Sequence, residues 1–144
     1  MLIDQINYLI STYRTRIQEL ADFLKETVTI IADLDELLPK ISGNGASFEE
    51  MVARNCGRIQ DLSSTGISSK MIEDFTSVLR GASYQKVSGL FGELTQDANS
   101  ARQKKTDEKE NAEAEKRRYS SLLSQAEADL IVARSEAQTG GGNV

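Results

Sequence analysis

The chain has 144 residues, a formal net charge of −5, one proline, one cysteine and no histidine. The single cysteine excludes an intramolecular disulfide, and without histidine the chain lacks the commonest metal ligand and the usual general base near neutral pH. The acidic balance argues against nucleic-acid binding, which needs a concentrated cationic face. We therefore expect no catalytic residue, no metal and no cofactor. The abundance of Ala, Glu, Lys, Leu, Ser and Gln favours an all-α protein.

The first long helix is predicted over residues 2–38. Its apolar residues recur at steps of four, three and four, which gives an eleven-residue pattern and a nearly straight stripe. We expect this helix to end before Pro39, because proline cannot continue a helix. The predicted stripe consists of Leu2, Ile6, Leu9, Tyr13, Ile17, Leu20, Leu24, Val28 and Ile31.

Two short helices are predicted between the long ones. Residues 40–47 are small or turn-forming and read as a loop, and Ser47 with Glu50 forms a capping box for a helix at about 48–60. The Ser- and Gly-rich stretch 63–66 breaks the chain again, and a second short helix follows at about 69–80.

The last long helix is predicted over about residues 82–137, and its later apolar positions fit a heptad repeat. The charged stretch 102–118 reads as a solvated part of this helix, stabilised by ion pairs at helical spacing. The predicted fold is thus an elongated antiparallel helical hairpin or coiled coil, a single domain over residues 1–137. We expect residues 138–144 to form a flexible tail. Because this helix outlasts the first, either the short middle helices pack along its surplus length or part of it meets a second chain.

Two groups of residues are candidates for function. Gly81 interrupts two helical patterns and is followed by small residues, so a tight helix joint is expected there. The joint residues are Leu79, Gly81, Tyr84 and Phe91. The second group forms either the hairpin face or a partner face, two alternatives that the pattern leaves open. It consists of Ile6, Tyr13, Leu20, Leu24, Ile31, Tyr119 and Leu122.

The joint resembles the Trp-x-Gly turn of the WXG superfamily of small helical-hairpin proteins from type VII secretion systems. Leu79 stands where that family has Trp, and Gly81, Ala82, Tyr84 and Phe91 follow in the same layout. With the inserted region and the extended last helix, the chain is most similar to the accessory proteins encoded beside LXG-type toxins.

This resemblance implies a targeting factor or chaperone-like escort that binds the helical N-terminal domain of a secreted effector, and a second small helical protein could join the complex. The family's export signal, Tyr or Phe followed four residues later by Asp or Glu, occurs at none of the Tyr and Phe positions, which favours an escort role. The alternative function is a homo-oligomeric coiled-coil scaffold or adaptor. We expect a cytoplasmic protein without membrane insertion, and secretion without a cleaved signal peptide stays open.

Overall fold

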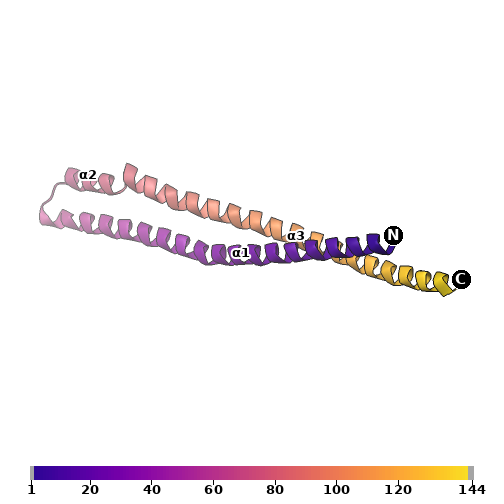
Figure 1. Cartoon of the computed structure of the whole chain (residues 1–144). Helices are drawn as coiled ribbons and strands as arrows, with labels where there is room; N and C mark the ends of the chain where they lie inside the picture. The colour runs from indigo at the N-terminus through magenta and orange to yellow at the C-terminus, as the bar shows by residue number, and fades with distance from the viewer. Residues whose placement is uncertain (1, 143–144) are drawn as a thin grey trace. The chain divides into compact units, whose positions relative to one another are not determined.

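The computed structural model describes residues 2–142, and the side chains of residues 2–140. The elements are α1 (Leu2–Asp61), a short 3-10 helix η1 (Leu62–Thr65), α2 (Ser69–Leu79) and α3 (Ala82–Gly142) (Figure 1). No strand occurs among these described residues. The long helices α1 and α3 are antiparallel and pack against each other, so the predicted all-α helical hairpin is confirmed.

The contacts within the chain divide into two compact units. Unit 1 consists of the described residues of Met1–Ile31 and Lys104–Val144, and unit 2 consists of Ala32–Gln103. Each unit therefore contains a stretch of α1 and a stretch of α3, and unit 2 also contains η1 and α2. The two units are described separately below, and the single domain over residues 1–137 stays a prediction.

The predicted end of the first helix at Leu38 is wrong, because α1 continues through Pro39 to Asp61. The predicted loop at 40–47 and the short helix at 48–60 are both part of α1, so the capping box at Ser47 does not begin a helix. Proline removes one backbone donor, but most helix stability in proteins comes from tertiary packing. Half-buried residues continue at helical spacing beyond the proline, at Ile41, Gly45 and Phe48, and this packing holds the helix together.

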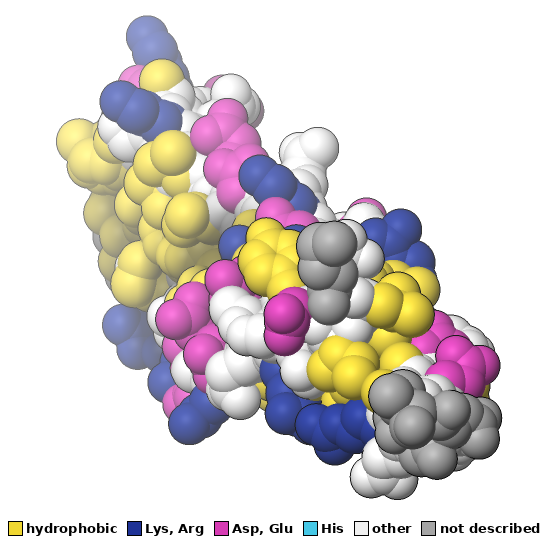
Figure 2. All heavy atoms as spheres, turned by 45° about the vertical axis from the view of Figure 1, so that its right-hand side comes forward, with side chains coloured by type: hydrophobic (Ala, Val, Ile, Leu, Met, Phe, Trp, Pro, Cys, Tyr) yellow, Lys and Arg dark blue, Asp and Glu magenta, His cyan; other side chains and the backbone are white. Residues whose placement is uncertain are grey.

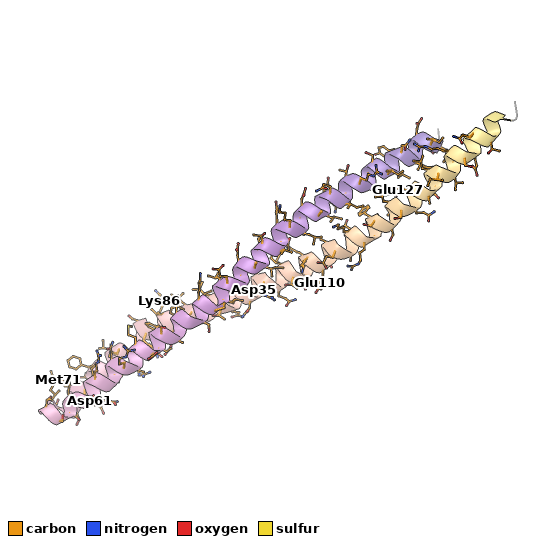
Figure 3. The ribbon with its side chains drawn as sticks, turned by 90° about the horizontal axis from the view of Figure 1, so that it is seen from below. Asp35, Asp61, Met71, Lys86, Glu110 and Glu127 are labelled. Atoms are coloured by element: carbon orange, nitrogen blue, oxygen red, sulfur yellow. The ribbon has the colours of Figure 1, made fainter. Side chains whose placement is uncertain are left out.

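The chain reverses between α1 and α2. Gly66 ends η1 in the left-handed conformation with φ 89°, which glycine adopts at low cost, and it is the only described residue with positive φ. Ser68 then caps α2, because its hydroxyl accepts a hydrogen bond from the backbone N–H of Met71 at 3.3 Å. Thus α2 is the one short α-helix between the long ones, and it lies beside the last part of α1 (Figures 1 and 3).

The buried face of α1 follows a heptad repeat, so the predicted eleven-residue pattern is wrong. Ile10 is 6% exposed and Thr27 is 2% exposed, whereas their neighbours Leu9 and Val28 are 40% and 48% exposed. Steps of three and four keep one seam against a partner helix, as in a coiled coil. The a and d positions, all buried or half-buried, are Ile3, Ile6, Ile10, Tyr13, Ile17, Leu20, Leu24, Thr27, Ile31, Leu34, Leu38, Ile41, Gly45, Phe48 and Val52.

The facing seam of α3 is also heptad-spaced, and α3 extends to Gly142 instead of ending near residue 137. Residues 138–142 of the predicted flexible tail are therefore helical, because glycine costs a helix only about 1 kcal/mol and does not by itself end one. Residues 143–144 lie outside the described residues. The seam positions are Tyr84, Ser88, Phe91, Thr95, Ala98, Arg102, Lys105, Lys109, Ala112, Lys116, Tyr119, Leu123, Ala126, Leu130 and Ala133.

Candidate protein-binding surface

The core of unit 1 is a small apolar cluster between α1 and α3. Ile6 and Ile10 of α1 pack with Ala126 and Ala133 of α3, and half-buried Ile3, Tyr13, Leu123 and Leu130 surround them. Tyr13 and Tyr119 meet with ring centroids 6.0 Å apart and tilted planes. The alanines bring the two helices close, so this seam is already occupied within the chain.

Most residues of the predicted hairpin or partner face lie on this internal seam. Ile6 and Leu20 are buried, and the other four on the seam are half-buried: Tyr13, Leu24, Ile31 and Tyr119. Leu122 differs, because its neighbour Leu123 takes the seam position and Leu122 is left 38% exposed. A partner surface must therefore be sought among the apolar side chains outside the seam.

The predicted joint at Gly81 lies between α2 and α3, but the chain does not reverse there. The Gly81 N–H donates to the carbonyl of Val78, and the Gly81 carbonyl accepts from Gln85, so the helices are interrupted by a short break. A Cβ at Gly81 would lie 2.8 Å from the carbonyl oxygen of Ser77. The glycine is required by this close approach and not by a positive φ.

Tyr84 and Phe91 are brought together by a third aromatic residue on α1. The ring of Phe48 lies 5.8 Å from that of Tyr84 and 6.0 Å from that of Phe91. The Arg80 guanidinium lies 5.8 Å from the centre of the Tyr84 ring. Leu79 is half-buried at the end of α2. Sequence reasoning missed Phe48 as a joint residue because it placed it in a separate short helix.

Glu49 adds a polar contact to the same joint. The Tyr84 hydroxyl donates a hydrogen bond to its carboxylate, and the Ser88 hydroxyl donates a second at 2.7 Å. These two hydrogen bonds, with the positive charge of Arg80, hold the pKa of Glu49 below its usual value. The same carboxylate raises the pKa of Tyr84. The joint thus links α1 and α3 through both aromatic packing and hydrogen bonds.

Cationic side chains occupy seam positions in the charged stretch of α3, which sequence reasoning read as solvated. In unit 2, Arg102 pairs with Asp35 of α1 and lowers the pKa of that carboxyl group through a hydrogen bond. In unit 1, Lys105 pairs with Glu108 at 3.0 Å and Lys109 with Glu113 at 3.8 Å. The predicted ion pairs at helical spacing are therefore present, and long aliphatic stems can cover the seam while their charges reach water.

A second group of apolar residues lies beside the seam in unit 1, mostly on α1. Arg16 of α1 pairs with Glu115 of α3 at 2.9 Å, and both residues occupy heptad position g. Leu9 lies seven residues before Arg16 on α1, and Leu122 lies seven residues after Glu115 on α3, so both also occupy position g. We call the exposed apolar residues at this position the g row of unit 1: Leu2, Leu9, Phe23, Ile30 and Leu122.

The opposite flank of unit 1 is largely polar. An ion pair of 3.1 Å joins the e positions of the two helices, between Arg14 of α1 and Glu127 of α3. Glu127 is labelled in Figure 3. Glu113 and Ser120 also lie at e positions of α3. An apolar stripe that covers a, d and g positions is wider than a two-helix seam needs and is typical of helices in larger bundles.

Unit 2 carries apolar surface of its own. Met71, Phe75 and Val78 follow one another at steps of four and three on the exposed side of α2, and Val78 is 75% exposed. Leu37, Met51, Leu90 and Leu94 of the long helices are also exposed. Figure 2 shows hydrophobic side chains gathered on the far, faded part of the surface, which belongs to unit 2.

The described residues include no group of three or more His, Cys, Asp or Glu side chains placed to hold a metal ion. Cys56 is buried, as expected for a small apolar residue. Over residues 2–142, no helix combines the length and apolar character needed to cross a membrane. Comparison of the chain with models of protein families, with curated proteins and with solved structures finds no match.

Proposed function

We propose that this protein is a non-enzymatic helical binding partner that escorts or targets an LXG-type effector of type VII secretion. The observation that carries the proposal is the row of apolar side chains at heptad position g, which α1 and α3 leave uncovered in unit 1. Uncovered rows at helical spacing are the surface that a helix of another chain needs for docking. The N-terminal domain of the effector, itself helical, supplies such helices.

The layout around Gly81 supports the proposal less strongly than the surface does. Leu79, Gly81, Tyr84 and Phe91 keep the order implied by the WXG resemblance. However, the chain reverses at Gly66, whereas the family turn itself joins the two antiparallel helices. The escort role therefore depends on the exposed apolar rows, with the LXG assignment as the specific form that we propose to test.

Co-expression with the helical N-terminal domain of an LXG-type toxin encoded beside this protein's gene tests the proposal. We expect the two chains to co-elute in size-exclusion chromatography as one complex of defined stoichiometry. Separate elution of two folded proteins would contradict the escort role. A neighbouring gene that encodes no secreted toxin would remove the reason for the LXG assignment.

The alternative function, a homo-oligomeric coiled-coil scaffold, is favoured by the heptad repeat along both long helices. Light scattering of the isolated protein over a wide concentration range separates the two functions. A scaffold predicts stable dimers or larger assemblies, whereas an escort without its cargo is expected to be a monomer.

A further inference from the structure

The g row of unit 1 has a rim of charged residues whose balance is negative. The carboxylates lie at the c and g positions that flank the row on both helices, and fewer cations lie among them. Ion pairs within the chain already engage three of these carboxylates, because Arg16 pairs with Glu115 at 2.9 Å and with Glu19 at 3.2 Å, and Lys105 pairs with Glu108. The carboxylates are Glu19, Glu26, Glu108, Glu115, Asp129 and Glu136, and the cations are Arg16, Lys104 and Arg118.

A hollow of about 300 Å³ lies at one end of this flank. It is lined by four apolar residues, Leu2, Ile6, Val132 and Ala133, and by two acidic residues, Asp129 and Glu136. A lysine or arginine side chain has an aliphatic stem for the first surface and a cation for the second. The hollow thus matches the chemistry of a long basic side chain.

From these two observations we infer that the g row of unit 1 is the docking face for one amphipathic helix of a different chain, with basic residues flanking its apolar stripe. Apolar side chains of that helix lie over Leu9, Phe23 and Leu122, and one of its basic residues enters the hollow beside Asp129. The inference deepens the proposed function and depends on it, because it specifies the helix that the effector must supply.

The charge of the rim argues against a second copy of this chain as the occupant. A copy would bring the same carboxylates to the same flank, and the chain as a whole carries a net charge of −5. Like charges placed opposite each other weaken an interface and suppress a wrong partner. A basic-flanked helix gains from the same rim in both association rate and affinity.

Two probes are used with the full chain in the experiment. The first is the N-terminal domain of the LXG-type toxin encoded beside the gene. The second is a pair of synthetic helical peptides with identical leucine spacing, one flanked by lysines and the other by glutamates. Affinities are measured by calorimetry for the wild-type protein and for each variant, and circular dichroism confirms that each variant is folded.

Phe23→Glu is the variant of the docking face, and Ile131→Glu is its matched control, because Ile131 is 69% exposed but lies at heptad position b. We expect Phe23→Glu to weaken binding of the toxin domain at least about tenfold, the scale of an interface hot spot, and Ile131→Glu to change it less than about twofold. Equal losses in both variants, or no loss in either, would overturn the docking face while leaving the proposed function intact.

The charge of the partner is tested separately. The double variant Asp129→Asn, Glu136→Gln is expected to weaken binding of the lysine-flanked peptide several-fold, whereas Glu110→Gln at position b serves as the neutral control. Equal affinity for the two peptides would overturn the inferred basic partner. A wild-type dimer that Phe23→Glu dissolves would also overturn it, because the occupant would then be a second copy.

The failure of the proposed function has a different signature. If the wild-type protein does not bind the toxin domain but binds the lysine-flanked peptide through Phe23, the escort role fails and the docking face stands. If it binds neither the toxin domain nor the lysine-flanked peptide, the docking face fails as well.

Discussion

Tyr84 of α3 and Glu49 of α1 are joined by a hydrogen bond from the phenol to the carboxylate, and Ser88, one helical turn further along α3, donates to the same group. This pair fixes the relation of the two long helices within unit 2 at the point where α3 begins. The contact is polar, although the aromatic rings of Phe48 and Phe91 lie directly beside it. The joint therefore combines ring packing with a group whose charge depends on pH.

Unit 2 is expected to lose stability in acid. The folded protein holds the pKa of Glu49 below its ordinary value of 4.5 and that of Asp35 below 3.8. Carboxylates with depressed pKa values stabilise the folded state above the unfolded pKa, and this contribution disappears as the pH falls through the folded pKa. Thermal unfolding followed by circular dichroism from pH 7 to pH 3 measures it. The variant Glu49→Gln, Asp35→Asn should show a flatter profile, and an unchanged slope would mean that these contacts do not form in solution.

Replacing Gly81 by alanine should destabilise the protein by about 1–3 kcal/mol. The new Cβ would lie 2.8 Å from the Ser77 carbonyl oxygen, so the backbone at the joint would have to shift. Gly89→Ala is the matched control, since nothing lies within 4 Å of a Cβ at Gly89 and alanine favours the helix by roughly 0.5–1 kcal/mol. Urea unfolding of both variants checks the opposite signs. A stabilised Gly81→Ala protein would show that the two helices are continuous there.

The continuity of α1 can be tested at Pro39. Because α1 runs through this residue, Pro39→Ala adds a backbone N–H that can join the helix hydrogen bonds and introduces a good helix former. The protein should therefore become more stable by about 1–3 kcal/mol. The gain should appear as a higher melting temperature and a small increase in helical circular dichroism. A lower melting temperature would instead support a chain break at the proline, with the turn that the sequence suggested.

The heptad seam can be distinguished from the eleven-residue stripe by two neighbouring residues. Ile10→Ala removes a side chain that is 6% exposed and packed in the core of unit 1, so we expect a loss of about 2–4 kcal/mol. Leu9→Ala removes a side chain that is 40% exposed and should cost less than about 1 kcal/mol. Equilibrium unfolding in urea compares the two, and a larger loss for Leu9 would reverse the assignment.

The fold class could be predicted because helix propensity and apolar spacing agree along most of the chain. The exact face could not be predicted. Exposed Leu9 is as apolar as the buried Ile10 beside it, and exposed Val28 is more apolar than the buried Thr27 beside it. The buried Thr27 hydroxyl donates to the carbonyl of Phe23 at 2.8 Å, which satisfies the polar group within the helix.

The break at Pro39 was wrongly predicted for a related reason. Local signals such as Pro39 and Gly45 argue for a loop, but they say nothing about the packing that opposes them. A Cβ at Gly45 would lie 3.5 Å from Phe91, so this glycine sits against an aromatic ring of α3 instead of marking a turn. The joint at Gly81 was predicted from the interruption of two helical patterns and from the small residues that follow, whereas its partners Phe48 and Glu49 come from a distant part of α1.

Gly66 has a left-handed backbone conformation at the point where the chain reverses between α1 and α2. A side chain at φ 89° costs roughly 1–2 kcal/mol, and substitution by alanine would favour right-handed backbone angles that let α1 run on into α2. Such an opened chain can regain its seams only by exchanging long helices with another chain that is opened in the same way. We therefore expect Gly66→Ala to shift the protein toward intertwined dimers at high concentration.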